Sequence, residues 1–218
     1  MTQTLRLSRR VGIGLAIAAG LALALPQIAQ AQGGARDQGA EQYVQTQAQR
    51  ALSILSDTSM SLPDKTRAFR GLVDQIADVP RITRFVLGKY ARTATPAQRQ
   101  QFDPLFRTYA QDVYETQLNQ YHGETVRVTG SVVRNPGDVI VNSVVSGGKL
   151  DKPAPVSWRV LNSGAGWKIV DVQASGVWLA ITQQQDFVST IDNHGGDIDA
   201  LISQLQQQAR RREAGRSN

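Results

Sequence analysis

The stretch VSWRVLNSGAGWKIVDVQA, residues 156–174, decides the fold class of this chain. Val156–Val160 alternates apolar and polar side chains, as a half-buried β-strand does. Residues 162–166 are rich in glycine and favour a turn, and Trp167–Ala174 has the composition of a second strand. Two such strands joined by a short turn predict an antiparallel hairpin.

Two more strands are expected on the N-terminal side of this hairpin. Thr125–Arg134 is rich in β-branched residues, residues 135–138 have the composition of a turn, and Val139–Val145 follows. A loop rich in glycine and charge, residues 146–153, then leads into the hairpin. We therefore predict a four-stranded antiparallel meander within residues 124–175.

Helical patterns flank the predicted sheet on both sides. Apolar residues recur at helical spacing in residues 37–55, 63–76, 80–90, 96–121, 180–192 and 198–205. Thr95-Pro96-Ala97-Gln98 carries a capping box with proline at the first helical position, and Pro104 should bend the helix that follows. The expected fold class is α+β, a twisted antiparallel sheet of about four strands packed against a helical layer.

The first 31 residues have the three parts of a secretory signal peptide. Three arginines precede an apolar run at residues 11–25, and Ala29-Gln30-Ala31 forms a small-x-small cleavage site. The apolar run contains only 15 residues, fewer than a membrane span usually needs. We expect residues 1–31 to be removed after export, by the general secretory or the twin-arginine route.

Residues 32–209 are expected to form one domain, with helices at about 37–122 and 176–209 and the sheet at about 124–175. Three of the 24 Lys and Arg residues lie in the first 31 residues, so 21 remain against 18 Asp and Glu. Four of those 21 lie in a basic tail at residues 210–218. We interpret this tail as a solvated helix end, with attraction to anionic lipid head groups as the alternative. The body without the tail is neutral, which argues against a nucleic-acid binder.

Few residues in the chain suit catalysis. There is no cysteine, which excludes disulfides, thiol catalysis and cysteine metal sites. His122 and His194 each lie beside a glycine at a predicted helix end, where histidine commonly contacts terminal carbonyls. No nucleophile elbow and no glycine-rich phosphate loop occurs. A Ser–His–Asp hydrolase stays open, because such triads assemble in space rather than in sequence.

An oxygen-rich cluster between two predicted helices invites a calcium assignment. It comprises Asp192, Asn193, Asp197 and Asp199. The cluster lacks the ligand spacing and the closing glutamate of an EF-hand. The end of one helix and the start of the next explain the same residues, so we expect no metal.

Large apolar side chains are concentrated around the last predicted strands. All three tryptophans lie between residues 158 and 178. Val170 and Val172 alternate against Trp167 and Ile169, so both faces of that strand carry apolar groups. A sheet packed on one side should show one polar face. Either helices cover both faces, or one face lines a cavity.

Several segments together resemble the MlaC, or toluene-tolerance, family of periplasmic phospholipid carriers. The segments are Phe85–Tyr90, Arg92–Arg99 with Phe102, Tyr121–Glu124, Gly137–Val141, Trp158–Val160, Gly166–Val172 and Gly176–Leu179. Their order and spacing match the family over about residues 41–205. One position departs from it: Trp178 stands where the family usually has a small polar residue, which puts the local pocket shape in doubt.

The resemblance implies a deep apolar pocket that holds acyl chains, with the lipid head group near solvent. It implies a carrier without cofactor or catalytic residues, most simply a monomer, that works in the periplasm. The family shuttles phospholipid between an outer-membrane lipoprotein–porin complex and an inner-membrane ABC transporter with an MCE-domain subunit. This traffic maintains the lipid asymmetry of the outer membrane.

The expected pocket lining combines apolar residues of the sheet and of the facing helices, and about half of them should be ordinary core. The candidates are Phe85, Tyr90, Phe102, Phe106, Tyr109, Val113, Val141, Trp158, Val160, Trp167, Ile169, Val172, Trp178 and Leu179. Two other functions stay open. A lipid esterase would need a reachable serine near His122 or His194, and a binder of another small hydrophobic solute would use the same pocket.

Overall fold

The computed structural model of this protein describes residues 35–118 and 121–216. The predicted signal peptide, residues 1–31, lies outside the described residues. None of the helices in the described part of the chain is long and apolar enough to cross a membrane.

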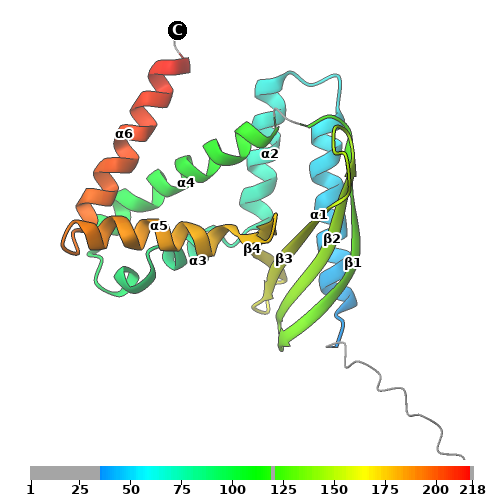
Figure 1. Cartoon of the computed structure of the whole chain (residues 1–218), viewed down its shortest axis with the longest axis horizontal. Helices are drawn as coiled ribbons and strands as arrows, with labels where there is room; N and C mark the ends of the chain where they lie inside the picture. Colours follow the sequence, from blue (N-terminus) through cyan, green and yellow to red (C-terminus); the bar gives the residue numbers. More distant parts are fainter. Residues whose placement is uncertain (1–34, 119–120, 217–218) are drawn as a thin grey trace, which may run out of the picture. The chain divides into compact units, whose positions relative to one another are not determined.

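An antiparallel sheet in the strand order β1-β2-β3-β4-β5 forms the centre of the fold (Figure 1). The strands are β1 Glu124–Asn135, β2 Asp138–Gly147, β3 Ala154–Asn162, β4 Trp167–Ala174 and β5 Val177–Trp178. The predicted meander is confirmed, with one short strand added. A tight turn makes β5 possible, because Ser175 and Gly176 both take a positive φ, of 51° and 80°.

A β-bulge in β4 explains the apolar pattern on both sides of that strand. Val160 pairs with Ile169 and Arg159 pairs with Asp171, so Val170 is the extra residue without a partner on β3. The bulge puts Ile169 and Val172 on the same face of the sheet, although three positions separate them. Trp158 lies opposite Val172 and extends that face across β3.

The helices agree with the sequence pattern except at two places. They are α1 Gln38–Ser56, α2 Leu62–Ile76, α3 Val79–Val86, the 3₁₀ helix η1 Gly88–Arg92, α4 Pro96–Leu118, α5 Leu179–Asn193 and α6 Ile198–Arg216. The helix predicted for residues 80–90 breaks after Val86, and the last helix continues to Arg216, far beyond residue 205. The capping box is present: the Thr95 hydroxyl accepts from the Gln98 amide, and the Gln98 side chain accepts from the Thr95 amide.

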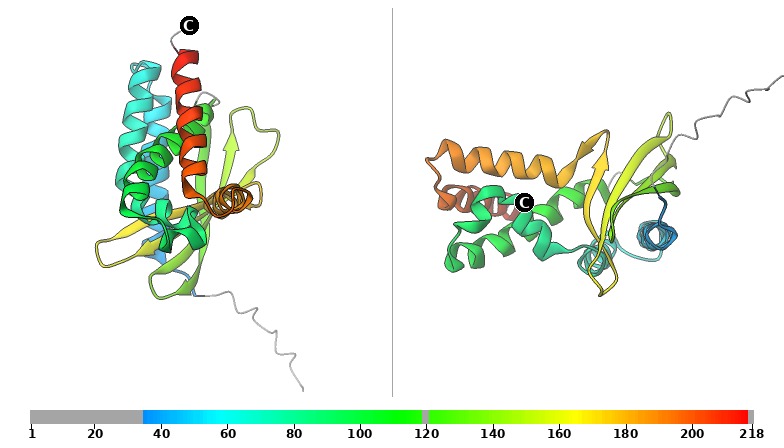
Figure 2. Two further views of the ribbon diagram at one scale, coloured as in Figure 1. Left: turned by 90° about the vertical axis from the view of Figure 1, so that its left-hand side faces the viewer. Right: turned by 90° about the horizontal axis from the view of Figure 1, so that it is seen from below.

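Two separate apolar cores support the domain. One lies among α3, η1, α4, α5 and α6, and contains Val86, Leu87, Phe102, Phe106, Phe187, Ile191, Leu201 and Ile202. The other lies between α1 and the sheet, and contains Ala40, Val44, Val139, Val141, Val160 and Ile169. Figures 1 and 2 show α1 alongside the strands and α3–α6 gathered on the side of β4.

Gly88 forms the break between α3 and η1. It takes a φ of +54°, and a Cβ there would lie 2.7 Å from Val188 Cγ2 on α5. We expect Gly88→Ala to lower the free energy of unfolding by about 1–3 kcal/mol, measured by chemical denaturation. The control is Gly71→Ala in α2, where nothing lies within 4 Å; it should raise stability by about 0.5–1 kcal/mol. Equal midpoints for the two variants would contradict this account of the break.

Candidate functional site

A cavity of about 370 Å³ lies between the two cores. Val86 and Phe106 of the helical core and Val44 and Ile169 of the sheet core all contribute to its wall. Val113 and Leu179 also line it, yet their exposed fractions are 43% and 51%. The cavity therefore opens to solvent near α4 and the start of α5.

The wall of the cavity is almost entirely apolar. Its aliphatic and aromatic members are Val44, Ala48, Ala51, Phe69, Leu72, Val73, Ile76, Ala77, Ile82, Val86, Phe106, Tyr109, Ala110, Val113, Trp158, Ile169, Val170, Val172, Leu179 and Ala180. The other described residues that line it are Gln47, Gln183 and Asp171, and Asp171 is the one charged group among them. Such a wall favours a hydrocarbon over a polar ligand.

Helix α1 is held on the sheet by polar contacts at its N-terminal half. The Asp37 carboxylate caps the helix by accepting from the Ala40 amide at 2.8 Å, and the Asp37 amide donates to the Ser131 hydroxyl of β1 at 2.8 Å. The Gln45 side chain donates to the Val126 carbonyl at 3.2 Å and accepts from the Val128 amide at 2.9 Å. With α1 fixed in this way, its stripe at Val44, Ala48 and Ala51 faces the cavity.

The structure brings half of the predicted lining residues to this wall. These are Phe106, Tyr109, Val113, Trp158, Ile169, Val172 and Leu179. Most of them come from α4 and from the face of the sheet that the β4 bulge creates.

The other half lies elsewhere, for physical reasons that differ. Phe102, Val141 and Val160 are completely buried inside the two cores, where neighbouring side chains surround them. Trp167 packs against the sheet core, and Trp178 occupies the cap position before α5. Phe85 is 37% exposed, and the Tyr90 hydroxyl donates to Asp192 at the far end of α5.

Sequence reasoning missed the α1, α2 and α3 side of the wall. Ala48, Leu72, Val73, Ile76 and Ile82 line the cavity from these helices. Their spacing is that of any amphipathic helix, so periodicity alone does not separate them from core residues. The small side chains Ala48, Ala51 and Ala110 are the signal that was available, because alanine fills less space than a larger apolar side chain.

Asp171 is buried at the junction of the cavity, β4 and α5. Its Oδ1 accepts hydrogen bonds from the Ala180 amide and from its own neighbour Val172, both at 2.8 Å. Burial raises the pKa of the Asp171 carboxyl, and the backbone hydrogen bonds and the charge of Arg159 act against that rise.

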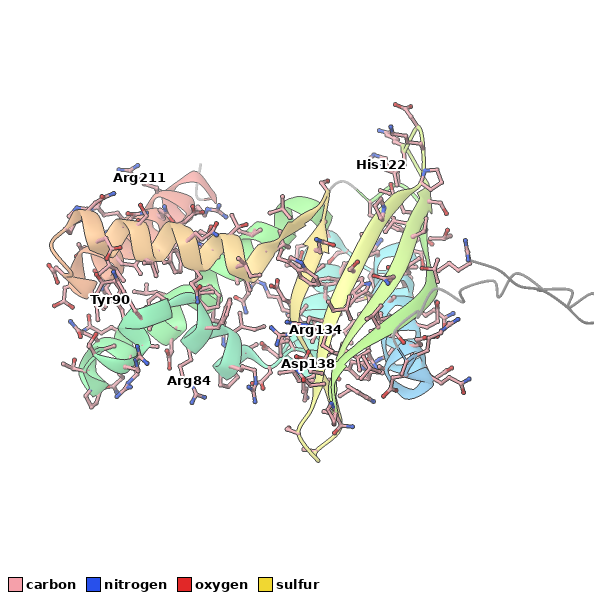
Figure 3. All side chains as sticks on the ribbon, turned by 60° about the horizontal axis from the view of Figure 1, so that its bottom comes forward. Arg84, Tyr90, His122, Arg134, Asp138 and Arg211 are labelled. Atoms are coloured by element: carbon pink, nitrogen blue, oxygen red, sulfur yellow. The ribbon has the colours of Figure 1, made fainter. Side chains whose placement is uncertain are left out.

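Asp138, in contrast, is buried in an ion pair outside the cavity. Both of its carboxylate oxygens accept from the Arg159 guanidinium, at 3.0 and 2.9 Å. These bonds hold the pKa of Asp138 below its usual range. Figure 3 shows Asp138 near Arg134, at the end of the β1–β2 hairpin.

Neither histidine lies in the cavity wall. Nδ1 of His194 lies 2.7 Å from the Thr190 carbonyl at the end of α5. The backbone amide of His122 donates to the side chain of Glu124, the first residue of β1, and Figure 3 shows the His122 side chain at that end of the sheet. The described lining residues thus contain neither the serine nor the histidine that an esterase acting in this cavity would need.

The oxygen-rich cluster is occupied by contacts within the protein. The Asp192 carboxylate pairs with Lys89 Nζ at 2.7 Å and accepts from the Tyr90 hydroxyl. Asp197 caps α6 by accepting from the Asp199 amide at 2.9 Å. Within residues 35–118 and 121–216, no three potential metal ligands of the His, Cys, Asp or Glu type gather.

An α+β fold that keeps an open apolar cavity between two cores defines a binding protein for an apolar ligand. The MlaC protein family matches residues 45–207, and this chain belongs to that family.

Known relatives agree with this assignment. The chain is 24% identical to the toluene tolerance protein ttg2D of Pseudomonas putida, over 62% of this chain and 63% of that protein. It is 25% identical to the intermembrane phospholipid transport system binding protein MlaC of Haemophilus influenzae, over 57% of this chain and 58% of that protein. The matched part thus spans about three fifths of the length of these relatives.

The fold is also similar to that of a solved structure. That structure is the phospholipid-binding protein from Ralstonia solanacearum in complex with a phospholipid. The TM-score is 0.68 at 26% sequence identity, and the comparison covers 78% of this chain and 96% of the other. The predicted fold class is confirmed by this likeness and by the antiparallel sheet and helices described above.

Proposed function

We propose that this protein is a periplasmic carrier that holds the acyl chains of a phospholipid in the cavity between its two cores. The observation that carries the proposal is the apolar wall, which contains a single charged side chain among the described residues. The relatives named for phospholipid transport and phospholipid binding support the choice of cargo.

The cavity has room for hydrocarbon. A single water-sized group needs about 10–15 Å³ of such space, and the cavity offers about 370 Å³, so it can admit acyl chains. Burying two chains of ~16 carbons keeps hydrocarbon worth some 25 kcal/mol of transfer free energy away from water. The open side near Val113 and Leu179 leaves the polar head group in solvent.

A carrier of this kind needs no catalytic group. A dry site that resembles the bilayer interior makes transfer nearly neutral, so direction comes from the partners that dock with the carrier. We propose that the partners are those of the family, an outer-membrane lipoprotein–porin complex and an inner-membrane MCE-domain ABC transporter. Shuttling between them as a monomer would maintain outer-membrane lipid asymmetry.

Extraction of the purified protein tests the proposed cargo. The full chain is expressed so that it is exported to the periplasm, and the processed protein is purified without detergent, extracted with organic solvent and analysed by mass spectrometry. We expect about one diacyl phospholipid per protein. A folded protein that carries no lipid, or that carries another hydrophobic solute, would contradict the proposal. Release of fatty acid from a bound phospholipid, lost in His122→Ala or His194→Ala, would instead support an esterase.

A further inference from the structure

The start of helix α5 lacks a local cap. The helix follows β5 directly, and its cap residue, Trp178, makes no side-chain hydrogen bond to the first turn. The first amides of a helix have no partner within the helix, so an acceptor is needed when they are buried. Ala180, in this first turn, is buried and lines the cavity.

Asp171 supplies that acceptor from the neighbouring strand. Its Oδ1 receives the Ala180 amide at 2.8 Å, and the residue is only 9% exposed. A carboxylate is well suited to this position, because the N-terminus of a helix carries partial positive charge. The first turn of α5 is therefore capped by β4 rather than by its own preceding residue.

We propose that Asp171 is a positioning residue that fixes the α5 wall of the cavity against the sheet and thereby slows the release of the cargo. The inference rests on the proposed function, since it concerns the same cavity. Leu179, Ala180 and Gln183 form this wall, and Leu179 lies at the open side.

The position of the contact explains why it matters. The cavity lies between the two cores, and the start of α5 packs against β4 beside it. The hydrogen bond from the Ala180 amide to the Asp171 side chain links α5 to the sheet. At another point the Asp78 amide, at the start of α3, links that helix to the sheet by donating to the Ile169 carbonyl at 2.9 Å. Without the cap, the first turn of α5 frays and the mouth widens where Leu179 and Val113 meet solvent.

Three variants test whether Asp171 positions the start of α5 or only stabilises the protein as a whole. Asp171→Ala removes the acceptor, whereas Asp171→Asn retains a carbonyl oxygen and loses the charge. Trp178→Ser, added to Asp171→Ala, supplies a local cap of the preferred type. The matched control is Asp138→Asn, since Asp138 is also 9% exposed and hydrogen-bonded but lies outside the cavity wall.

The measurement is the rate at which a fluorescent phosphatidylcholine passes from the loaded protein to phosphatidylcholine vesicles. We expect Asp171→Ala to speed this release about two- to thirty-fold, the range that corresponds to the loss of a helix cap. Asp171→Asn should speed it less, Asp171→Ala with Trp178→Ser should return it toward the parent rate, and Asp138→Asn should leave it unchanged. Thermal unfolding of each variant shows whether release merely follows stability.

Two results would overturn the inference. One is parental release by Asp171→Ala, and the other is equal acceleration by Asp138→Asn. Amide hydrogen exchange at residues 180–183 reports on the cap even when the protein holds no lipid. This exchange should accelerate in the single variant Asp171→Ala but not when Trp178→Ser is added. If the parent binds no phospholipid while this exchange behaves as expected, the proposed cargo is wrong and the cap is right. If Asp171→Ala does not fold, the double variant with Trp178→Ser should fold, and its failure to do so would also count against the cap.

Discussion

The double substitution Ala48→Trp/Ala110→Trp is expected to leave the protein folded and nearly free of phospholipid. Ala48 lines the cavity from α1, and Ala110 lines it from α4. Two indoles would occupy much of the space of about 370 Å³ that acyl chains need. They would do so without removing any polar contact, because the alanine side chains make none.

The expected effect is large because each methylene of the lipid that enters the cavity contributes to the binding free energy. Excluding only about two methylenes, at about 0.8 kcal/mol each, weakens binding about ten-fold. Two indoles should exclude several times that number, so co-purified phospholipid should fall at least about ten-fold. The free energy of unfolding should hold or rise, because filling a cavity restores packing contacts.

A tryptophan at an exposed position of α4, the helix that carries Ala110, is the control. Ala97 lies on α4, is exposed, and does not line the cavity. Ala97→Trp should therefore retain the parental amount of lipid, measured by extraction and mass spectrometry. Parental lipid in the Ala48→Trp/Ala110→Trp variant would show that the cargo binds outside this cavity.

Local patterns predicted the elements because each element has its own local cause. The alternation in Val156–Val160 and the capping box at Thr95 report, respectively, a half-buried strand and a helix start, and the structure contains both. The break at Gly88 was missed, since its cause is the approach of Val188 from a distant helix. The bulge at Val170 was missed for a similar reason, because it is defined by pairing with β3.

The cavity depends on distances that no local pattern contains. Phe102 and Phe106 are one turn apart on α4, and both belong to the helical core. Phe106 reaches the edge of that core and lines the cavity, whereas Phe102 is enclosed. Periodicity assigns the two residues the same role, and only the arrangement of α1, α2 and β4 separates them. The family resemblance supplied the expectation of a pocket that periodicity left undecided.

Phe102→Ala is expected to be the most destabilising change at any predicted lining residue. The Phe102 ring has no exposed surface and lies 5.9 Å from the Phe106 ring and 5.8 Å from the Phe187 ring, between centroids. Truncation of such a side chain leaves a void and lowers the free energy of unfolding by about 3–5 kcal/mol. Chemical denaturation measures this loss, and lipid content per folded molecule should stay near the parental value.

Val113→Ala is the matched change on the same helix, and it should affect lipid release more than stability. Val113 lines the cavity with its side chain 43% exposed, so truncation leaves no closed void and should cost less than about 1 kcal/mol of stability. It should instead speed lipid release, because the side chain stands at the open side of the cavity. A core residue such as Phe102 should thus affect mainly the free energy of unfolding, whereas a cavity residue such as Val113 should affect mainly the rate of lipid release. If Phe102→Ala lost its lipid while keeping its stability, the ring would belong to the wall, and the boundary drawn here between cavity and core would be wrong.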